Sequence, residues 1–300
     1  MNIIFGPILS RRFGKSLGVD LSPSKKQCNF DCLYCELKPS VTMSEYGDVV
    51  SVDEVVNAIK EALDTHPNID FLTITANGEP TLYPHLRELM QEINSFKGDI
   101  KTLILSNSST IYKREIQETL MLFDVVKLSL DCATQKCFQK IDRSLNISVE
   151  DIKKGILEFN KKYKGELNIE ILFVKGVNDK ESEIKVLNDY LRKLNVNRID
   201  ISTIDRPPAY NVLPLSYKEL VDISLQFDKS LPINIAYKPK ESDSKFDYSK
   251  EDILHTLSLR PLTKDNINAL FSKSAKRNLQ ELLDGNMVKF DKGYFVKGEG

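Results

Sequence analysis

Apolar segments with the pattern of β-strands alternate with amphipathic helical patterns through most of this 300-residue chain. Each helical pattern places apolar residues three and four positions apart, as Leu86, Leu89 and Ile93 are. Strands that alternate with helices of this length predict βαβ units and a parallel sheet with right-handed crossovers. The six expected strands are residues 17–21, 71–75, 102–106, 125–130, 169–174 and 199–204.

The six strand–helix units fall within residues 1–240, and their number limits the kind of α/β fold. A closed barrel of eight units typically needs about 250 residues. Six units therefore favour an open, partial (βα)6 TIM-type barrel, and a doubly wound open sheet is the alternative. Both folds place functional residues at the carboxyl ends of the strands.

The last part of the chain has a different pattern. Residues 241–249 have the polar composition of a linker. Beyond them we expect helices at 252–259 and 263–271, and a third helix that Ser272 can cap. Strands at 287–290 and 294–296 flank Asp291-Lys292-Gly293, which predicts a hairpin. Three helices and a hairpin resemble a winged-helix module, so we expect residues 250–300 to form a small winged-helix domain.

Three cysteines, Cys28, Cys32 and Cys35, stand close together directly after the first expected strand. Cysteine thiolates are soft ligands that select zinc, copper(I) or iron–sulfur clusters. Three ligands are one fewer than a structural zinc site usually has, which leaves a position open for catalysis. Spacing alone is also compatible with a zinc knuckle, a redox site or an incidental group of buried thiols.

Polar or glycine-rich residues follow the other five expected strands, on the rim of the sheet where the cysteines are also expected. Loops are often polar, but five such segments in succession on one rim predict a functional site there. The segments are Asn77-Gly78-Glu79-Pro80, Ser106-Asn107-Ser108, Asp131, Lys175-Gly176-Val177-Asn178-Asp179 and Asp205-Arg206-Pro207-Pro208.

The segment 28–35, with an aromatic residue before its third cysteine, resembles the cluster loop of the radical S-adenosylmethionine (SAM) superfamily. The resemblance implies a [4Fe–4S] cluster on the three thiols, with the fourth iron left for SAM. Asn77-Gly78-Glu79-Pro80 is similar to the superfamily's glycine–glutamate motif, which holds the SAM amino group, although Asn77 replaces the usual first glycine. By position, the resemblance implies SAM ribose or carboxylate contacts at Ser106, Asn107, Ser129 and Asp131.

The same resemblance implies the reaction. An external one-electron donor of the flavodoxin or ferredoxin type would reduce the cluster. SAM would then be cleaved to methionine and a 5′-deoxyadenosyl radical, which abstracts hydrogen from a substrate. The cofactors carry this chemistry, and the protein must hold them in a closed, dry pocket.

Residues 10–14 and 18–20 resemble those of a bacterial subgroup related to the tRNA wyosine-base synthases, which makes an RNA base the leading substrate class. Arg11 and Arg12 are candidates to clamp a phosphate or carboxylate, or one of them pairs with a carboxylate of the barrel. Arg206 is a candidate substrate contact on the same terms.

A partner protein is the alternative substrate. Residues 175–179 are similar to a segment of the enzymes that activate glycyl-radical proteins. Lys175 would then pair with a carboxylate, or it is simply an exposed lysine. A third hypothesis is a non-catalytic iron–sulfur or zinc sensor that binds DNA through the C-terminal module, where Lys273, Lys276 and Arg277 begin the third expected helix.

Composition sets the remaining expectations. The formal net charge is -1, so no global positive field attracts nucleic acid or a membrane. Five cysteines without an export signal predict a cytoplasmic protein with free thiols. No apolar run approaches the ~18 residues needed to span a bilayer, so we expect no membrane segment. Cys132 and Cys137 are expected to be buried or surface thiols, because two thiols without further ligands cannot hold an auxiliary cluster.

Overall fold

The computed structural model describes residues 3–10, 14–66, 68–144, 146–237, 245, 247–259, 262–264, 267–268, 271–291 and 294–298. Its main feature is an eight-stranded sheet whose strands lie side by side in sequence order. The strands are β1 (Ile4–Ser10), β2 (Gly14–Asp20), β3 (Phe71–Thr75), β4 (Lys101–Ser106), β5 (Val125–Ser129), β6 (Glu166–Phe173), β7 (Arg198–Thr203) and β8 (Ile233–Ile235).

The sheet is an open barrel. Strands β2 to β8 pair in parallel, and β1 pairs antiparallel with β2 at one edge. A doubly wound sheet reverses its strand order at a switch point, whereas this order runs from β1 to β8 without reversal. The predicted six units are confirmed as β2 to β7, and the doubly wound alternative is wrong.

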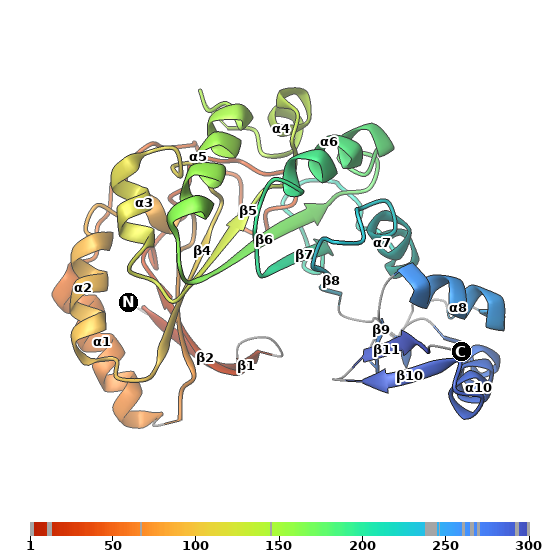
Figure 1. Ribbon diagram of the computed structural model, residues 1–300. Helices are drawn as coiled ribbons and strands as arrows, with labels where there is room; N and C mark the ends of the chain where they lie inside the picture. The colour runs from red at the N-terminus through yellow and green to blue at the C-terminus, as the bar shows by residue number, and fades with distance from the viewer. Residues whose placement is uncertain are drawn as a thin grey trace.

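Helices cover the outer face of the curved sheet, as Figure 1 shows. Their apolar stripes pack on outward-facing strand residues that are fully buried, such as Leu128, Ile171 and Ile201. Capping boxes begin α1 and α7, at Ser51 with Glu54 and at Ser216 with Glu219. The helices are α1 (Val52–Thr65), α2 (Leu86–Phe96), α3 (Arg114–Leu120), α4 (Gln135–Ile141), α5 (Val149–Lys162), α6 (Glu181–Leu191) and α7 (Tyr217–Ser224).

The inner face of the sheet carries polar side chains between those apolar ones. Successive residues of a strand point to opposite faces, so Lys127 and Ser129 lie on the other side of β5 from Leu128. Glu170 on β6 and Asp200 on β7 are paired in register and share that inner face. The barrel interior is therefore polar rather than a packed apolar core.

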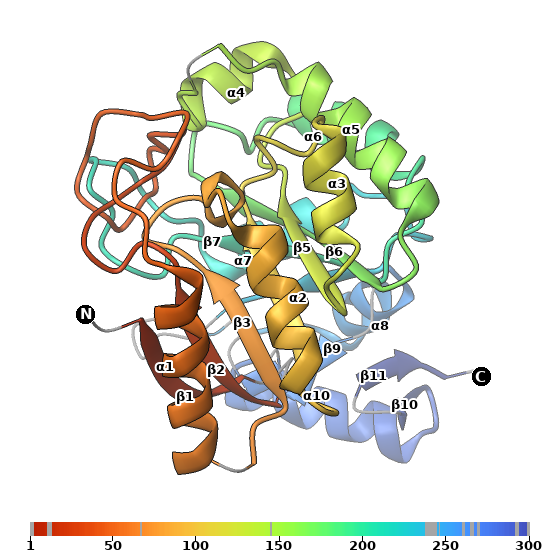
Figure 2. The same cartoon turned by 90° about the vertical axis from the view of Figure 1, so that its left-hand side faces the viewer.

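The C-terminal residues form a separate small unit beside α7 (Figures 1 and 2). A second apolar cluster joins Ile253, Phe271 and Leu279 to Tyr217 and Val221 of α7. The predicted hairpin strands are confirmed, within one residue, in a three-stranded antiparallel sheet of order β10-β11-β9. The elements are α8 (Lys250–Leu259), β9 (Leu262–Thr263), α10 (Lys273–Asp284), β10 (Val288–Asp291) and β11 (Tyr294–Lys297).

The helix expected at 263–271 and the linker expected at 241–249 can be compared with the structure only in part. The helix expected at 263–271 begins too early, because Thr263 lies in β9. Part of that helix, residues 265–266 and 269–270, lies outside the described residues, as do residues 241–244 and 246 of the expected linker. The winged-helix assignment and its domain boundaries stay predictions.

Candidate SAM and iron–sulfur site

The loop between β2 and α1 carries the three cysteines and lies over the carboxyl ends of the strands, beyond the arrowhead of β3 in Figure 2. Gln27 holds this loop in shape. Its side-chain amide donates to Ser22 Oγ and to the carbonyl of Asp48, both at 2.8 Å, and its Oε1 accepts from the backbone of Gly47 at 2.8 Å. The side chain of Gln27 is fully buried, so the loop is built around a satisfied amide.

Gly78 fixes the loop to the end of β3. The backbones of Gln27 and Gly78 form an isolated parallel bridge, and Gly78 has a φ of 146°. A Cβ at this position would lie 1.8 Å from the carbonyl oxygen of Gln27. Only a glycine fits here, because the backbone of the cysteine loop approaches the position too closely for a side chain.

The three thiols line one cavity of about 440 Å³. Cys28, Cys32 and Cys35 are free thiols, of which Cys28 is buried and the other two are half-buried. Burial raises the pKa of Cys28 to about 12 and raises that of Cys32 well above its ordinary value. Both are neutral thiols near pH 7 in the bare protein, so binding a metal must release their protons.

The three thiols of the cysteine loop do not all lie close enough together to ligate one zinc ion as they stand. Among the described residues, only Cys132, Cys137 and Glu183 form a group of three ligand-type side chains whose atoms all lie within 4.8 Å. Two thiolates on one zinc can be at most about 4.6 Å apart, because each Zn–S bond is about 2.3 Å. At least one pair among Cys28, Cys32 and Cys35 is therefore too far apart for one zinc.

Polar groups lie directly beside the first thiol. The backbone N–H of Phe30 donates to Cys28 Sγ at 3.4 Å, and the side-chain amide of Asn107 reaches the same sulfur at 3.6 Å. Hydrogen bonds to the sulfurs are one means by which proteins set the potential of an iron–sulfur cluster. The cavity thus offers three free thiols with donors to sulfur, which fits a [4Fe–4S] cluster.

Glu79 joins two of the predicted rim segments. Its buried carboxylate accepts hydrogen bonds from the backbone N–H of Asn107 at 2.6 Å and from Ser106 Oγ at 2.8 Å, as well as from Thr81. Burial raises the pKa of Glu79 although these donors act in the opposite direction. Gly78, Glu79, Ser106 and Asn107 lie together on the cavity wall.

The first and last residues of the Asn77–Pro80 segment are directed away from the cavity. The side-chain amide of Asn77 donates to Asp20 Oδ2 at 2.6 Å, which ties the end of β3 to β2. Pro80 is buried at the start of a short 3₁₀ helix, Pro80–Leu82. Neither residue lines the cavity, so their part in SAM binding would be indirect.

Ser129 and Asp131 were both expected to contact SAM, but they differ in their position relative to the cavity. Ser129 lines the cavity, but Asp131 lies behind it. Asp131 accepts a 2.5 Å hydrogen bond from the hydroxyl of Tyr34 and one of 2.7 Å from the backbone of Leu172. Burial raises the pKa of Asp131. Its observed contacts position the cysteine loop rather than reach the space where SAM would bind.

The predicted substrate contacts have different outcomes. Arg206 lines the cavity and pairs with Glu36, next to the third cysteine, at 2.6 and 2.7 Å. Lys175 is on the surface, where its Nζ lies 2.7 Å from Glu219 Oε1, and it does not line the cavity. Arg11 and Arg12 lie outside the described residues.

Sequence reasoning missed Lys127 and Glu170, which line the same cavity from β5 and β6. A signal was present. A strand buried on both faces of a parallel sheet usually reads as a continuous apolar run. Segments 125–130 and 169–174 instead place a charged residue between apolar ones.

Residues 138–142 contact the cysteine loop, and sequence reasoning did not predict these contacts. The backbone N–H of Leu33 donates to the carbonyl of Ile141 at 2.8 Å, and that of Asp31 donates to the carbonyl of Asp142 at 3.1 Å. Phe30 packs edge-on against Phe138 with ring centroids 5.4 Å apart.

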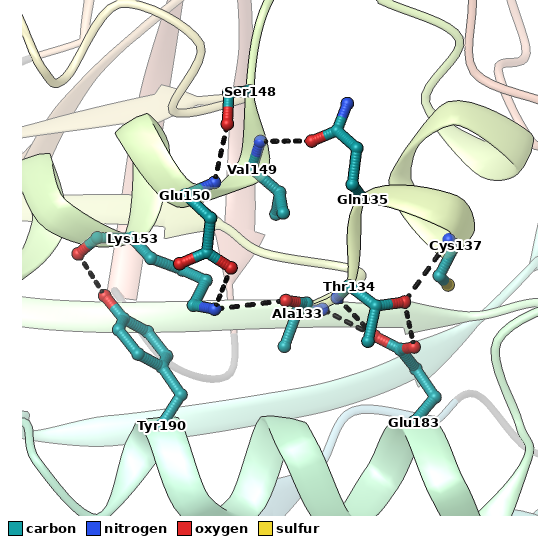
Figure 3. Close-up of polar contacts among 10 residues, drawn as sticks. All are labelled: Ala133, Thr134, Gln135, Cys137, Ser148, Val149, Glu150, Lys153, Glu183 and Tyr190. Atoms are coloured by element: carbon teal, nitrogen blue, oxygen red, sulfur yellow. Dashed lines mark hydrogen bonds and ion pairs between the residues drawn. The ribbon is translucent and has the colours of Figure 1, made fainter.

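Cys132 and Cys137 form a disulfide, with Cα atoms 5.7 Å apart. The expectation of two thiols is therefore wrong, although both residues are buried as one alternative held. Figure 3 shows the polar contacts around Cys137 and Glu183. Glu183 of α6 accepts from the backbone of Ala133 at 2.6 Å and from Thr134 Oγ1 at 2.6 Å. With the thiols joined and this carboxylate engaged, the group holds the turn rather than an auxiliary cluster.

The Radical SAM superfamily model matches residues 23–185, which include the cysteine loop and strands β3 to β6. A UPF0026 protein of Helicobacter pylori is 44% identical over 295 residues, covering 97% of this chain and 94% of its own. This chain belongs to the radical SAM superfamily, within the UPF0026 family. It is accordingly an enzyme that uses a [4Fe–4S] cluster and SAM.

Solved structures support the fold of this radical SAM enzyme. A radical SAM methyltransferase from Sphaerobacter thermophilus matches with a TM-score of 0.59 at 14% identity, covering 75% of this chain and 67% of that one. TYW1 with a lysine-pyruvate adduct bound matches with a TM-score of 0.54 at 19% identity, covering 72% and 74%. These identities are low, so the likeness extends to the partial barrel and no further.

Two further findings concern the electron donor and the membrane. Enzymes of this superfamily require an external electron donor. None of the helices in the described ranges is both long enough and apolar enough to span a bilayer.

Proposed function

We propose that this protein cleaves SAM reductively at a [4Fe–4S] cluster held by Cys28, Cys32 and Cys35, and abstracts hydrogen from an RNA base. The observation that carries the proposal is the single cavity that the three free thiols share with polar side chains of the barrel wall. When bound, the cluster and SAM would supply the 5′-deoxyadenosyl radical.

The chain's own residues would bind and orient the cofactor. The buried carboxylate of Glu79 is fixed by its donors and can take the positive amino group of SAM. Ser106, Asn107 and Ser129 can bind hydroxyl or carboxylate oxygens. Asn77, Pro80 and Asp131 would act as positioning residues, because they hold strand ends or the cysteine loop.

The size of the cavity bears on the substrate. About 440 Å³ is within the range of small-molecule sites, roughly 300–1,000 Å³. The cluster and SAM would take much of this space, so what remains suits one base turned out of its strand and not a stacked base pair. The relation of this subgroup to wyosine-base synthases, one of which is TYW1, favours an RNA base over a partner protein.

The C-terminal module would contribute to RNA binding. Residues 250–300 contain nine Lys and Arg against seven Asp and Glu, a small positive excess. Lys273 and Arg277 are exposed at the start of α10. Deleting residues 250–300 should weaken a gel shift with unmodified tRNA, and equal binding by the truncated and full chains would contradict this role.

The test of the main proposal is anaerobic. The protein is reconstituted with iron and sulfide, reduced with dithionite or with a flavodoxin or ferredoxin, and incubated with SAM. We expect 5′-deoxyadenosine from the native chain and none from Cys32→Ala, because three thiolates are needed to hold the cluster. Met121→Ala, at the exposed residue directly after α3, is the matched control. Normal product from Cys32→Ala would overturn the proposal, and a DNA-binding sensor would give no product from any variant.

A further inference from the structure

The outer face of α4 (Gln135–Ile141) is basic. Lys136 and Lys140 are exposed and stand four residues apart, so their side chains lie next to each other on one face of the helix. Arg143, which is half-buried, follows two residues after the helix. In the part of the chain that the structure describes, neither lysine forms an ion pair. Both lysine charges therefore remain available to a partner.

The stability of the helix does not explain this charge. Like charges four residues apart on a helix repel each other. The helix dipole favours Lys140 in the last turn, but Lys136 stands in the first turn, where the dipole disfavours a cation. The one carboxylate within residues 135–143, that of Asp142, is buried and offers no compensation at the surface. A basic surface of this kind favours an acidic partner.

The same helix ends against the cysteine loop. The backbone N–H of Leu33 donates to the carbonyl of Ile141 at 2.8 Å, and Cys32 Sγ donates to Asp142 Oδ1 at 3.5 Å. Lys140 is therefore one residue away from a hydrogen bond to the cysteine loop. Electron transfer slows steeply with the distance between donor and acceptor, so a donor seated on α4 would reach the loop by a short path.

Covalent and polar contacts hold this surface in place. The disulfide joins Cys137, in the first turn of α4, to Cys132, and Thr134 caps the helix by accepting from the backbone N–H of Cys137. Arg143 forms an ion pair with Asp31 of the cysteine loop. A surface that is already ordered loses little conformational freedom when a partner binds.

The thiol cavity is less suited to an acidic protein. Its exposed charged residues are Glu36, Asp205 and Arg206, so the charge there is mixed rather than basic. SAM and the substrate must also enter that cavity. Helix α4 lies on the side of the barrel away from the C-terminal unit (Figures 1 and 2), so a protein bound to α4 would leave that unit free to hold RNA.

We propose that the outer face of α4, formed by Lys136 and Lys140 with Arg143 beside them, docks an acidic one-electron donor protein of the flavodoxin or ferredoxin type. The donor loses one electron, the oxidised [4Fe–4S] cluster gains it, and no covalent bond forms or breaks. This inference rests on the proposed function for the cluster at the cysteine loop, and it adds the surface through which that cluster is reduced. Electron-transfer encounters commonly use small interfaces, and exposed charges make them salt-dependent.

The test compares two routes of reduction of the reconstituted protein without oxygen. Binding of a bacterial flavodoxin and of a ferredoxin is measured by isothermal titration calorimetry, and loss of the cluster's visible absorbance is followed with each reduced donor or with dithionite. At least one donor should bind the native chain, less tightly as salt is raised. In the Lys136→Glu, Lys140→Glu double variant, we expect donor binding at least about tenfold weaker and slower reduction by the donor. Reduction by dithionite should stay within about twofold, since a small reductant needs no docking surface.

Lys161→Glu, Lys162→Glu is the matched control, because it makes the same change of charge at two exposed residues of α5. The first turn of α5 contacts α4, where the backbone of Val149 donates to Gln135. Lys161 lies at the other end of α5, roughly 18 Å further along the helix. This variant should bind the donors within about twofold of the native chain.

Binding of neither donor by the native chain, or equal binding by the native chain and the double variant at α4, would overturn the inference. Equal losses with the donors and with dithionite would also contradict it, because α4 would then only support the cluster. A weaker tRNA gel shift with unchanged donor binding would assign this face to RNA instead. If the double variant loads less iron than the native chain, Lys136→Gln, Lys140→Gln takes its place, with about threefold weaker binding expected and unchanged binding contradictory.

The same preparations separate this inference from the proposed function. Formation of 5′-deoxyadenosine is measured with dithionite and SAM, without any donor protein. Its absence from the native chain counts against the proposed function, whereas its presence with no docking on α4 counts only against this inference.

Discussion

The two faces of the curved sheet differ although they are made from the same strands. On the outer face, Leu128, Ile171 and Ile201 are fully buried beneath helices. On the inner face, neighbours of these residues are polar and line a cavity, as Ser129 and Glu170 do. The outer face therefore supplies the stability of the fold, and the inner face is left for ligands.

Substitutions at two neighbouring residues of β5 test this difference between the two faces most directly. Leu128→Ala should lower the free energy of unfolding by about 3 kcal/mol, because it removes buried methyl groups and leaves a cavity. Ser129→Ala, one residue further on the opposite face, should change it by less than about 1 kcal/mol. Urea unfolding monitored by circular dichroism measures both, and equal losses would contradict the division between faces.

A substitution at Gly78 tests whether the bridge between Gln27 and Gly78 positions the cysteine loop. Gly78→Ala should cost about 2 kcal/mol, because the residue has a positive φ and the new Cβ would meet the carbonyl of Gln27. The loop must shift to admit it, so iron bound per chain after reconstitution should also fall. Gly98→Ala is a control at a positive φ with nothing within 4 Å. A variant of Gly78 that loads iron normally would show that the bridge does not position the loop.

The disulfide joins Cys132, in the segment that follows β5, to Cys137 of α4. It therefore links the sheet to a helix of the outer layer. Joining Cys132 to Cys137 closes a small loop and should stabilise the fold by about 2 kcal/mol relative to the Cys132→Ser, Cys137→Ser double variant. Adding dithiothreitol should lower the melting temperature of the native chain and leave that of the double variant unchanged. If the native chain does not respond, the pair is not bonded in solution.

The smallest effect is expected at Glu219, far from the inner face. Partial burial would raise the pKa of Glu219, but hydrogen bonds from Lys175 and Ser216 outweigh this and lower it to about 2. A carboxyl whose pKa is lower in the folded state stabilises the fold above its unfolded pKa, about 4.3. That contribution is lost as the pH falls from there toward 2.

Glu219→Gln removes this pH dependence. We expect a loss below about 1 kcal/mol at pH 7, since the group is more than a third exposed and solvent screens the pair. The loss should shrink toward pH 3 in unfolding curves measured at several pH values. A difference between the variant and the native chain that is the same at pH 7 and pH 3 would contradict the assignment.

Residue patterns alone were enough to predict the outer face and the cysteine loop. Periodic apolar residues identify each helix, and the spacing of Cys28, Cys32 and Cys35 identifies the loop. The cavity wall could be anticipated only in part. Lys127 and Glu170 alternate with apolar residues, but which strands bring them together depends on the register of the sheet.

Other features depend on contacts that no local pattern contains. The bond between Cys132 and Cys137 requires the turn that Glu183 holds from a distant helix. Asp131 is aimed at Tyr34 instead of the cavity because the cysteine loop folds over the end of β5. Lys175 pairs with Glu219 across 44 positions of sequence.

The central claim is that the three thiols hold a cluster that SAM reaches inside this cavity. Electron paramagnetic resonance of the reconstituted, dithionite-reduced protein tests it most directly, recorded with and without SAM. The account predicts a signal from a reduced [4Fe–4S] cluster that changes when SAM is added, and no such signal from Cys32→Ala. A signal that SAM leaves unchanged, or one that persists in Cys32→Ala, would contradict it.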